Sequence, residues 1–197
     1  MGPTSRKTRI KASVPQQEQD ILAAAAAEFT AVGYRGANMD DVAARAGVSR
    51  STLYRRFPNK DALFRAVAVE TFEVGVAALE DAVVGLPPKE AVVEIFALGA
   101  EMVETQPLLR RMVHEDHSVR QVTDSIGSLF IEMVTARVGA TLRACGAEMP
   151  DDDLLEAVEI HVRVVISYLE VPASDPGRWD PGYVRRVAEK HLAPMIY

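Results

Sequence analysis

The sequence predicts an all-α fold of about nine helices, and three observations favour it. Across the 197 residues there is no sustained alternation of apolar and polar positions and no Asn-Gly or Asp-Gly turn between apolar runs, so the signals of β-strands are nearly absent. Apolar residues recur instead at three- and four-residue spacing. Glycines and prolines interrupt this pattern at intervals typical of helix ends.

The first two helices are bounded by residues that favour helix ends. We expect the first helix to end at Gly33, because glycine adopts the left-handed conformation of a helix C-terminus without steric cost. Asn38 can cap the second helix through its amide, with Asp41 in the position of a capping box, and Gly47 ends that helix. The apolar face of the first helix is formed by Ile21, Leu22, Ala25 and Phe29.

The remaining helices follow from the same signals. We expect Ser49 to cap a short third helix that ends at Pro58. A long fourth helix starts near Lys60 and runs to about Val84. Five further helices are predicted over residues 89–104, 107–113, 118–145, 152–171 and 181–195.

The stretch AGVSRSTLYRRF, residues 46–57, is strongly basic. Two short helices joined by a glycine turn have the geometry of a helix-turn-helix, which places its second helix in the major groove of DNA. Val48, Leu53 and Phe57 would anchor this helix to the core. Arginine can bond guanine edges and hydroxyl groups can bond phosphate oxygens, so the remaining residues suit DNA binding. The alternative is an exposed amphipathic helix whose arginines only maintain solubility.

The charge is distributed unevenly along the chain. The formal net charge is −6, yet residues 1–70 hold 11 Lys and Arg against 7 Asp and Glu, whereas residues 71–197 hold 11 against 21. Binding of nucleic acid requires a basic surface. We therefore expect the basic N-terminal third and the acidic remainder to bind different partners.

Residues 21–64 resemble the N-terminal domain of TetR-family transcriptional regulators. The matching positions are Ile21, Leu22, Ala24, Ala25, Phe29, Gly33, Tyr34, Val42, Ala43, Ala46, Gly47, Val48, Ser49, Leu53, Tyr54, Phe57 and Lys60. The resemblance implies a homodimeric repressor in which a three-helix helix-turn-helix domain is joined by a long helix to a larger helical domain that binds a small molecule and dimerises. Two positions depart from the family pattern: Asn38 stands where threonine is usual, and Arg56 replaces the commoner histidine or tyrosine.

We expect three segments: a flexible basic arm (residues 1–15), a helix-turn-helix DNA-binding domain (16–62) and a ligand-binding and dimerisation domain (63–197). By the resemblance, Tyr54 and Lys60 lie where family members contact phosphates. The candidate DNA-binding residues of the second segment are Asn38, Ser49, Arg50, Ser51, Thr52, Tyr54, Arg55, Arg56 and Lys60.

The arm supplies further candidates for DNA contact. It has no apolar periodicity, so in isolation it is expected to be disordered. Such a segment can enter the minor groove, where basic side chains respond to a narrow, A·T-rich width; the alternative is a solvated tail without function. Its basic candidates are Arg6, Lys7, Arg9 and Lys11.

Two helices near the C-terminus are predicted to form a dimer interface. Apolar residues cover more than one side of the predicted helix 152–171. A helix that is apolar on more than one side needs more than one neighbouring element to pack against. The apolar stripe of residues 181–195 is formed by Val184, Val187, His191 and Met195. With a symmetry mate these helices would form a four-helix interface, where the resemblance also places it, and two-fold symmetry predicts a palindromic operator. Alternatively, both stripes only complete the core of the subunit.

The helices of the C-terminal part carry residues that suit a small-molecule cavity, since methionine and aromatic side chains adapt to varied apolar shapes. His161 and Tyr168 lie two turns apart on one face and would supply polar anchors. The ligand candidates are Phe96, Met102, Met112, Phe130, Met133, His161 and Tyr168, and the effector is expected to be largely apolar. Ordinary core packing is the alternative, with a hydrogen-bonded core histidine at position 161.

Other functional classes have little support. The segment HEDHS, residues 114–118, lacks the spacing of zinc proteases, and there is no P-loop, dinucleotide fingerprint or nucleophile motif. We therefore expect no metal, no cofactor and no enzymatic activity. The single cysteine, Cys145, suits a reducing compartment, and no apolar run approaches the length of a membrane span, so we expect a cytoplasmic protein.

These observations predict a homodimeric DNA-binding regulator, which we expect to act as a repressor. A small molecule would release it from DNA by shifting the population of its conformations. Two alternatives remain open. The first is a DNA-binding regulator without a small-molecule effector. The second is a small helical enzyme or metal-binding protein in which the arginine-rich helix only solubilises one end.

Overall fold

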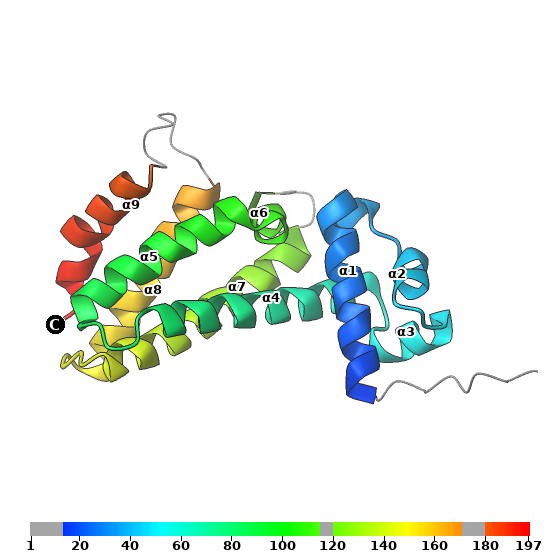
Figure 1. Ribbon diagram of the computed structural model, residues 1–197, viewed down its shortest axis with the longest axis horizontal. Coiled ribbons are helices and arrows are strands. Elements are labelled where there is room, and N and C mark those ends of the chain that lie inside the picture. The colour runs from blue at the N-terminus through cyan, green and yellow to red at the C-terminus, as the bar shows by residue number, and fades with distance from the viewer. Residues whose placement is uncertain (1–13, 115–119, 171–179) are drawn as a thin grey trace, which may run out of the picture. The chain divides into compact units, whose positions relative to one another are not determined.

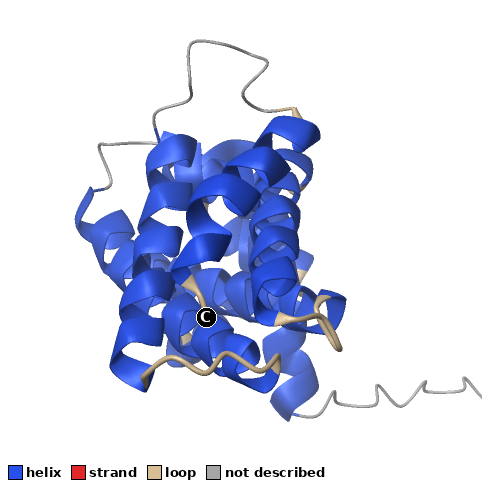
Figure 2. Cartoon of the chain, turned by 90° about the vertical axis from the view of Figure 1, so that its left-hand side faces the viewer, coloured by secondary structure: helices blue, strands red, loops and turns tan. Residues whose placement is uncertain are grey.

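A computed structural model describes residues 14–114, 120–170 and 180–197, with the side chains of 113–114, 120–126 and 168–170 left out (Figure 1). Within these ranges the chain forms nine α-helices and no strand, which confirms the all-α prediction (Figure 2). The helices are α1 (Val14–Gly36), α2 (Met39–Arg45), α3 (Arg50–Arg56), α4 (Lys60–Ala82), α5 (Pro88–Thr105), α6 (Pro107–His114), α7 (Arg120–Ala144), α8 (Asp151–Glu170) and α9 (Pro181–Val187).

The chain divides into two compact units, an N-terminal unit (Met1–Phe64) and a C-terminal unit (Arg65–Tyr197). The first contains α1, α2, α3 and the start of α4, and the second contains the rest of α4 together with α5 to α9. The assignment of DNA binding to one part and of ligand binding and dimerisation to the other remains a prediction.

Glycines mark the helix ends where the sequence predicts them. Gly33 has a φ of 71° and a ψ of 175°, so the helical path of α1 breaks there, although one more turn continues to Gly36. Gly85, with a φ of 81°, follows the end of α4, and Gly146, with a φ of 97°, lies between α7 and α8. Side chains with a Cβ rarely adopt this backbone conformation.

The core of the N-terminal unit is built on the apolar face of α1. The predicted residues Ile21, Ala25 and Phe29 are buried there, whereas Leu22 is half-buried. The ring of Phe29 packs edge-on against Phe64 of α4 with 4.8 Å between their centroids. This packing fixes the start of α4 against α1 within the unit.

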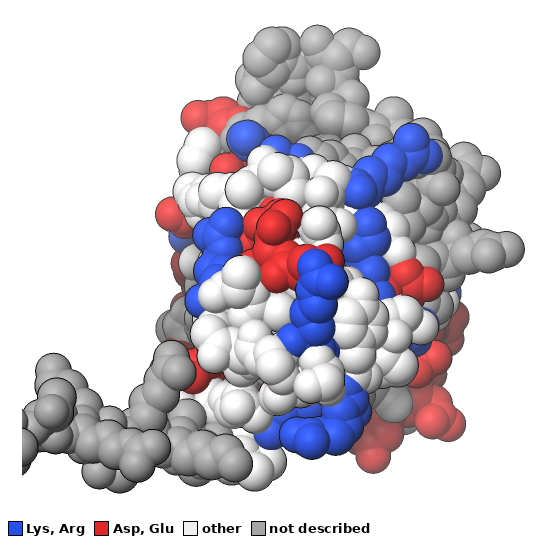
Figure 3. Space-filling view, turned by 90° about the vertical axis from the view of Figure 1, so that its right-hand side faces the viewer, with Lys and Arg blue, Asp and Glu red and all other residues white. Residues whose placement is uncertain are grey.

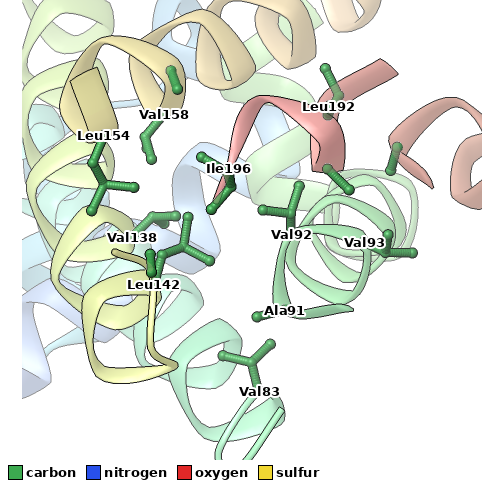
Figure 4. Close-up of a cluster of buried hydrophobic side chains, with 14 of the residues drawn as sticks. Val83, Ala91, Val92, Val93, Val138, Leu142, Leu154, Val158, Leu192 and Ile196 are labelled. Atoms are coloured by element: carbon green, nitrogen blue, oxygen red, sulfur yellow. The ribbon is translucent and has the colours of Figure 1, made fainter. Parts of the chain in front are cut away.

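The core of the C-terminal unit brings together helices that are distant in sequence (Figure 4). Val138 and Leu142 of α7 face Leu154 and Val158 of α8, and the side chain of Ile196 enters the same cluster (Figure 4). Helices α7 and α8 approach closely at Gly139. A Cβ atom there would lie 2.9 Å from Cδ2 of Leu155, so a larger residue would require the Leu155 side chain to move.

The segment 181–195 differs from the single helix that the sequence predicts. Helix α9 ends at Val187, and a π-helical turn (Ala188–Leu192) and a 3₁₀ turn (Ala193–Met195) follow. The wider π turn changes the register, so Ala188, Leu192 and Ile196 complete the core of the unit. Of the predicted stripe, only Val184 is buried; Val187 and Met195 are half-buried and His191 is exposed.

Candidate nucleic-acid interface

Helices α2 and α3 form a helix-turn-helix whose ends are capped as predicted. The Asn38 side chain accepts a hydrogen bond from the backbone N–H of Asp40 at 2.9 Å. Gly47 adopts a φ of 66° in the turn, and the Ser49 hydroxyl accepts a hydrogen bond from the Thr52 N–H at 3.2 Å. The reciprocal part of the predicted capping box is absent, since no hydrogen bond joins the side chain of Asp41 to Asn38 among the described contacts.

The two faces of α3 differ in the way the sequence predicts. Leu53 is completely buried and Phe57 is 7% exposed, so these side chains attach the helix to the core, and Val48 is half-buried beside them. The opposite face is polar and open to solvent. Its exposed members are Arg50, Ser51, Tyr54 and Arg55, whereas Thr52 is half-buried.

The hydroxyl groups at the start of α3 bind one another. Ser49 Oγ lies 2.9 Å from both Ser51 Oγ and Thr52 Oγ1. Each hydroxyl has one proton and two lone pairs. The network therefore orients these three groups and leaves hydrogen-bonding capacity for a phosphate oxygen.

Arg50, the first residue of α3, forms an ion pair with Asp40 of α2. The arginine side chain is 72% exposed and the aspartate side chain 35% exposed, so both remain open to solvent. On the surface of the helix-turn-helix unit, basic side chains border a smaller acidic patch (Figure 3). Sequence reasoning did not find this acidic partner, because the two positions are ten residues apart in the sequence and lie on different helices.

Two of the basic DNA-binding candidates, Arg56 and Lys60, are bound within the N-terminal unit instead of projecting freely into solvent. Arg56 is paired with Glu18 of α1 at 2.6 Å, and its side chain is only 14% exposed. Its guanidinium also donates a hydrogen bond to the Val14 carbonyl at 3.1 Å. The structure therefore gives Arg56 a part in holding α3 to α1, which sequence reasoning missed because these contacts join distant positions.

Lys60 caps the end of α1. Its ammonium group donates hydrogen bonds to the carbonyl oxygens of Arg35 and Ala37 at 3.2 and 3.1 Å. The same group lies 4.7 Å from the centroid of the Tyr34 ring. Unpaired carbonyls at a helix C-terminus attract a cation, so this lysine stabilises the domain whether or not it also contacts a phosphate.

Tyr34 joins the same corner of the unit to α4. Its hydroxyl donates a hydrogen bond to the Asp61 carboxylate. Burial, with smaller contributions from this bond and from the negative charge of Asp61, raises the pKa of Tyr34 to about 12. The phenol therefore stays neutral near neutral pH and keeps its hydrogen bond.

The four DNA-binding candidates of the N-terminal arm, which lie between positions 6 and 11, fall outside the described residues.

The ligand candidates lie in the C-terminal unit, mostly half-buried. Phe96, Phe130 and Met133 pack against its apolar cluster, and Phe130 meets Phe72 edge-on with 4.6 Å between the ring centroids. Met102 and Met112 are also half-buried. The side chain of Tyr168 lies outside the described residues. Their role in binding a ligand stays a prediction.

Among the ligand candidates whose side chains are described, only His161 is buried, with 8% of its surface exposed. It forms a hydrogen bond with the Leu192 backbone, whereas its Nε2 atom has no partner among the described residues. Burial lowers the pKa of His161 to about 4 and outweighs the opposing effect of the Leu192 bond. The histidine is therefore neutral at physiological pH.

The remaining predictions concern metal and membrane. Most of the segment 114–118 falls outside the described residues, and in the part that is described no three His, Cys, Asp or Glu side chains gather as a metal site would require. Among the described helices, none combines the length and apolar character needed to cross a bilayer.

Comparison with known proteins finds a family match in the N-terminal part of the chain. Residues 21–67, which contain the helix-turn-helix, match the pattern of the bacterial regulatory proteins of the tetR family. The helix-turn-helix part of the chain is therefore similar to that of the tetR family. The resemblance found in the sequence is thereby confirmed, and the family consists of transcriptional regulators, not enzymes.

Curated relatives match part of the length of this chain. It is 29% identical over 109 residues to the HTH-type transcriptional regulator RutR of Escherichia coli, which covers 55% of this chain and 50% of RutR. The chain thus spans about half the length of this relative. An uncharacterised HTH-type regulator of Mycobacterium bovis is 26% identical over 127 residues, covering 63% of this chain and 66% of the relative.

Solved structures of TetR-family proteins share the fold over nearly the whole chain. The repressor AlkX from Dietzia sp. superposes with a TM-score of 0.66 at 23% identity, covering 87% of this chain and 92% of AlkX. A TetR-family regulator from Mesorhizobium loti gives a TM-score of 0.67 at 17% identity, covering 94% and 97%. At these identities the similarity establishes the arrangement of helices and not the ligand.

Proposed function

We propose that this protein is a homodimeric repressor that binds a palindromic DNA operator and is released from it by a small molecule. The observation that carries the proposal is the outward face of α3, where Arg50, Tyr54 and Arg55 are exposed opposite a buried apolar face. A helix anchored in this way presents its polar side chains to a major groove.

The exposed residues divide into two roles. Arg50 and Arg55 have the donor geometry to bond guanine O6 and N7, which specifies sequence. Ser51, Thr52 and Tyr54 offer hydroxyl groups to phosphate oxygens, which fixes the position of the helix on the duplex. Arg56 and Lys60 act mainly by holding α3 and α4 in place, because their charged groups are bound within the unit.

Dimerisation through residues 152–171 and 181–195 is supported by apolar groups that the subunit leaves uncovered. Leu155 and Ile160 of α8 are each 41% exposed, although neighbouring positions of the same helix are buried in the core. Val187 of α9 is also only half-buried, whereas Met195 packs against the core of its own unit. A two-fold dimer would place the half-sites of the operator about one helical turn apart, roughly 34–36 Å, or a multiple of this.

Release by an effector is the second part of the proposal. The C-terminal unit contains half-buried aromatic and methionine side chains together with the buried Nε2 of His161, which suits a largely apolar molecule with one polar group. Such a ligand would favour a conformation in which the two recognition helices no longer fit the duplex. A difference in affinity of roughly 100-fold, near 2.7 kcal/mol, is sufficient to release an operator.

The test starts from a random duplex library. Selection with the wild-type protein is expected to yield an inverted repeat, which reports DNA binding and two-fold symmetry together. Replacing both exposed arginines, Arg50→Ala with Arg55→Ala, should reduce affinity for the selected duplex at least about 100-fold, since each base-reading arginine contributes about 1–3 kcal/mol.

Arg110→Ala is the matched control, because this arginine is also exposed but lies on α6. Affinity that falls equally in both variants, or a selection that yields no preferred sequence, contradicts the proposal. If no small molecule in a broad screen changes the affinity for DNA, the protein is a regulator without an effector. The proposed release by a small molecule is then wrong.

A further inference from the structure

The ion pair between Arg50 and Asp40 places an acid directly on the face proposed to meet DNA. Arg50 Nη2 contacts Asp40 Oδ2, and both side chains remain accessible, at 72% and 35%. Ion pairs this exposed contribute little to stability. The pair is therefore poorly explained as a support for the fold, since Leu53 and Phe57 already attach α3 to the core.

The carboxylate changes what Arg50 can bind. A phosphate carries a full negative charge, and Asp40 repels it, whereas guanine O6 and N7 are uncharged acceptors that suffer much less repulsion. The guanidinium has five N–H donors, so contact through Nη2 leaves other donors available for a base edge. The same contact restricts the rotamers of a long side chain that would otherwise reach many phosphates.

We propose that Asp40 is a positioning residue that directs Arg50 toward base edges and away from phosphates, and so raises sequence specificity at the cost of non-specific affinity. This inference rests on the proposed DNA-binding function and goes beyond it, because it assigns a role to an acidic residue on a surface expected to be basic.

The chain provides a close control in Asp41. This residue follows Asp40 in the first turn of α2, is exposed, and makes no ion pair with Arg50 in the structure. Asp40→Asn and Asp41→Asn remove the same charge from nearly the same place and weaken the interaction with the helix dipole alike. A difference between the two variants therefore reports the contact with Arg50.

The experiment measures affinity for two duplexes, the selected one and a scrambled one of equal composition, at a series of salt concentrations. Asp40→Asn should bind the scrambled duplex more tightly and steepen the slope of log K against log salt by about 0.9 per subunit, as expected for one added phosphate contact. The ratio of specific to non-specific affinity should fall about tenfold, the value of one base-reading arginine. Asp41→Asn should leave this ratio unchanged.

A second comparison tests whether Asp40 acts through Arg50. In an Arg50→Ala background, Asp40→Asn and Asp41→Asn should have equal effects, because the arginine on which Asp40 is proposed to act has been removed. Equal slopes and ratios for the two asparagine variants in the wild-type background overturn the inference. If the wild-type protein selects no sequence at all, the proposed function has failed; if it does and Asp40→Asn changes nothing, only the role of Asp40 is wrong.

Discussion

The exposed arginines of α3 and the arginines of the C-terminal unit meet different partners. Arg50 and Arg55 project into solvent, with only Asp40 bound to the first. In the C-terminal unit, by contrast, Arg137 of α7 bonds two glutamates of α4, and Arg185 of α9 bonds Glu94 of α5 through both terminal nitrogens. The hydrogen bond from Arg185 holds the pKa of Glu94 below its usual value.

This contrast shows why residue type alone does not reveal function. In α3, Arg50 and Arg55 stay exposed to solvent, and only Arg50 has a partner, the accessible Asp40. In α7 and α9, by contrast, Arg137 and Arg185 bond glutamates 57 to 91 residues away in the sequence and so join distant helices. The first kind of arginine is available to another molecule, and the second connects parts of one fold. Substitutions should separate the two kinds by what they change: affinity for DNA or stability.

The largest effect on stability is expected at His161, a polar residue enclosed by the C-terminal unit. Its pKa of about 4 lies below the value of 6.5 expected in the unfolded chain, so the unfolded state binds the proton more readily. The unit should therefore keep its full stability above pH 6.5 and lose about 3 kcal/mol as the pH falls to 4. Urea denaturation at a series of pH values measures this loss.

The control for His161 is another histidine of the same unit. His161→Leu should flatten the pH dependence between 6.5 and 4, whatever its effect at pH 7, because it removes the titrating group. His191→Leu should not, since His191 is exposed. An unchanged slope in His161→Leu would mean that the acid sensitivity arises elsewhere.

A smaller loss is expected at Arg143, which closes the turn between α7 and α8. Its guanidinium donates hydrogen bonds to the carbonyl oxygens of Ala147 and Met149. Since the side chain is 36% exposed, water replaces part of what these bonds supply, and Arg143→Ala should cost about 2 kcal/mol. Thermal and urea unfolding measure this. Asp151→Ala, which removes a partner that is 85% exposed, should cost much less; equal costs would contradict the importance of the carbonyl bonds.

The sequence predicted those features that depend on local rules. The caps at Asn38 and Ser49, the turn at Gly47 and the burial of Leu53 follow from the preferences of single residues and from helical spacing. This is also why the exposed face of α3 could be located before the structure.

Features that depend on tertiary packing were not predictable in this way. The binding of Arg56 to Glu18 spans 38 residues, and no spacing rule connects them. The π turn at Ala188–Leu192 changed the buried face of the C-terminal segment, because the helical period assumed for residues 181–195 does not hold through it. Whether half-buried residues such as Phe130 and Met133 line a ligand site depends on a cavity that residue types do not define.

The sharpest form of the comparison lies between two adjacent residues of α3. Arg55 is exposed, whereas Arg56 is 14% exposed and bound to Glu18 and to the Val14 carbonyl. Arg56→Ala should lower the free energy of unfolding by about 1–2 kcal/mol through the loss of these charge-assisted bonds. Arg55→Ala should change it by less than about 0.5 kcal/mol and yet weaken binding to the selected duplex about tenfold or more. Urea denaturation and DNA titration of the two variants measure both quantities, and the distinction between internal and outward arginines fails if Arg55→Ala destabilises the protein as much as Arg56→Ala does.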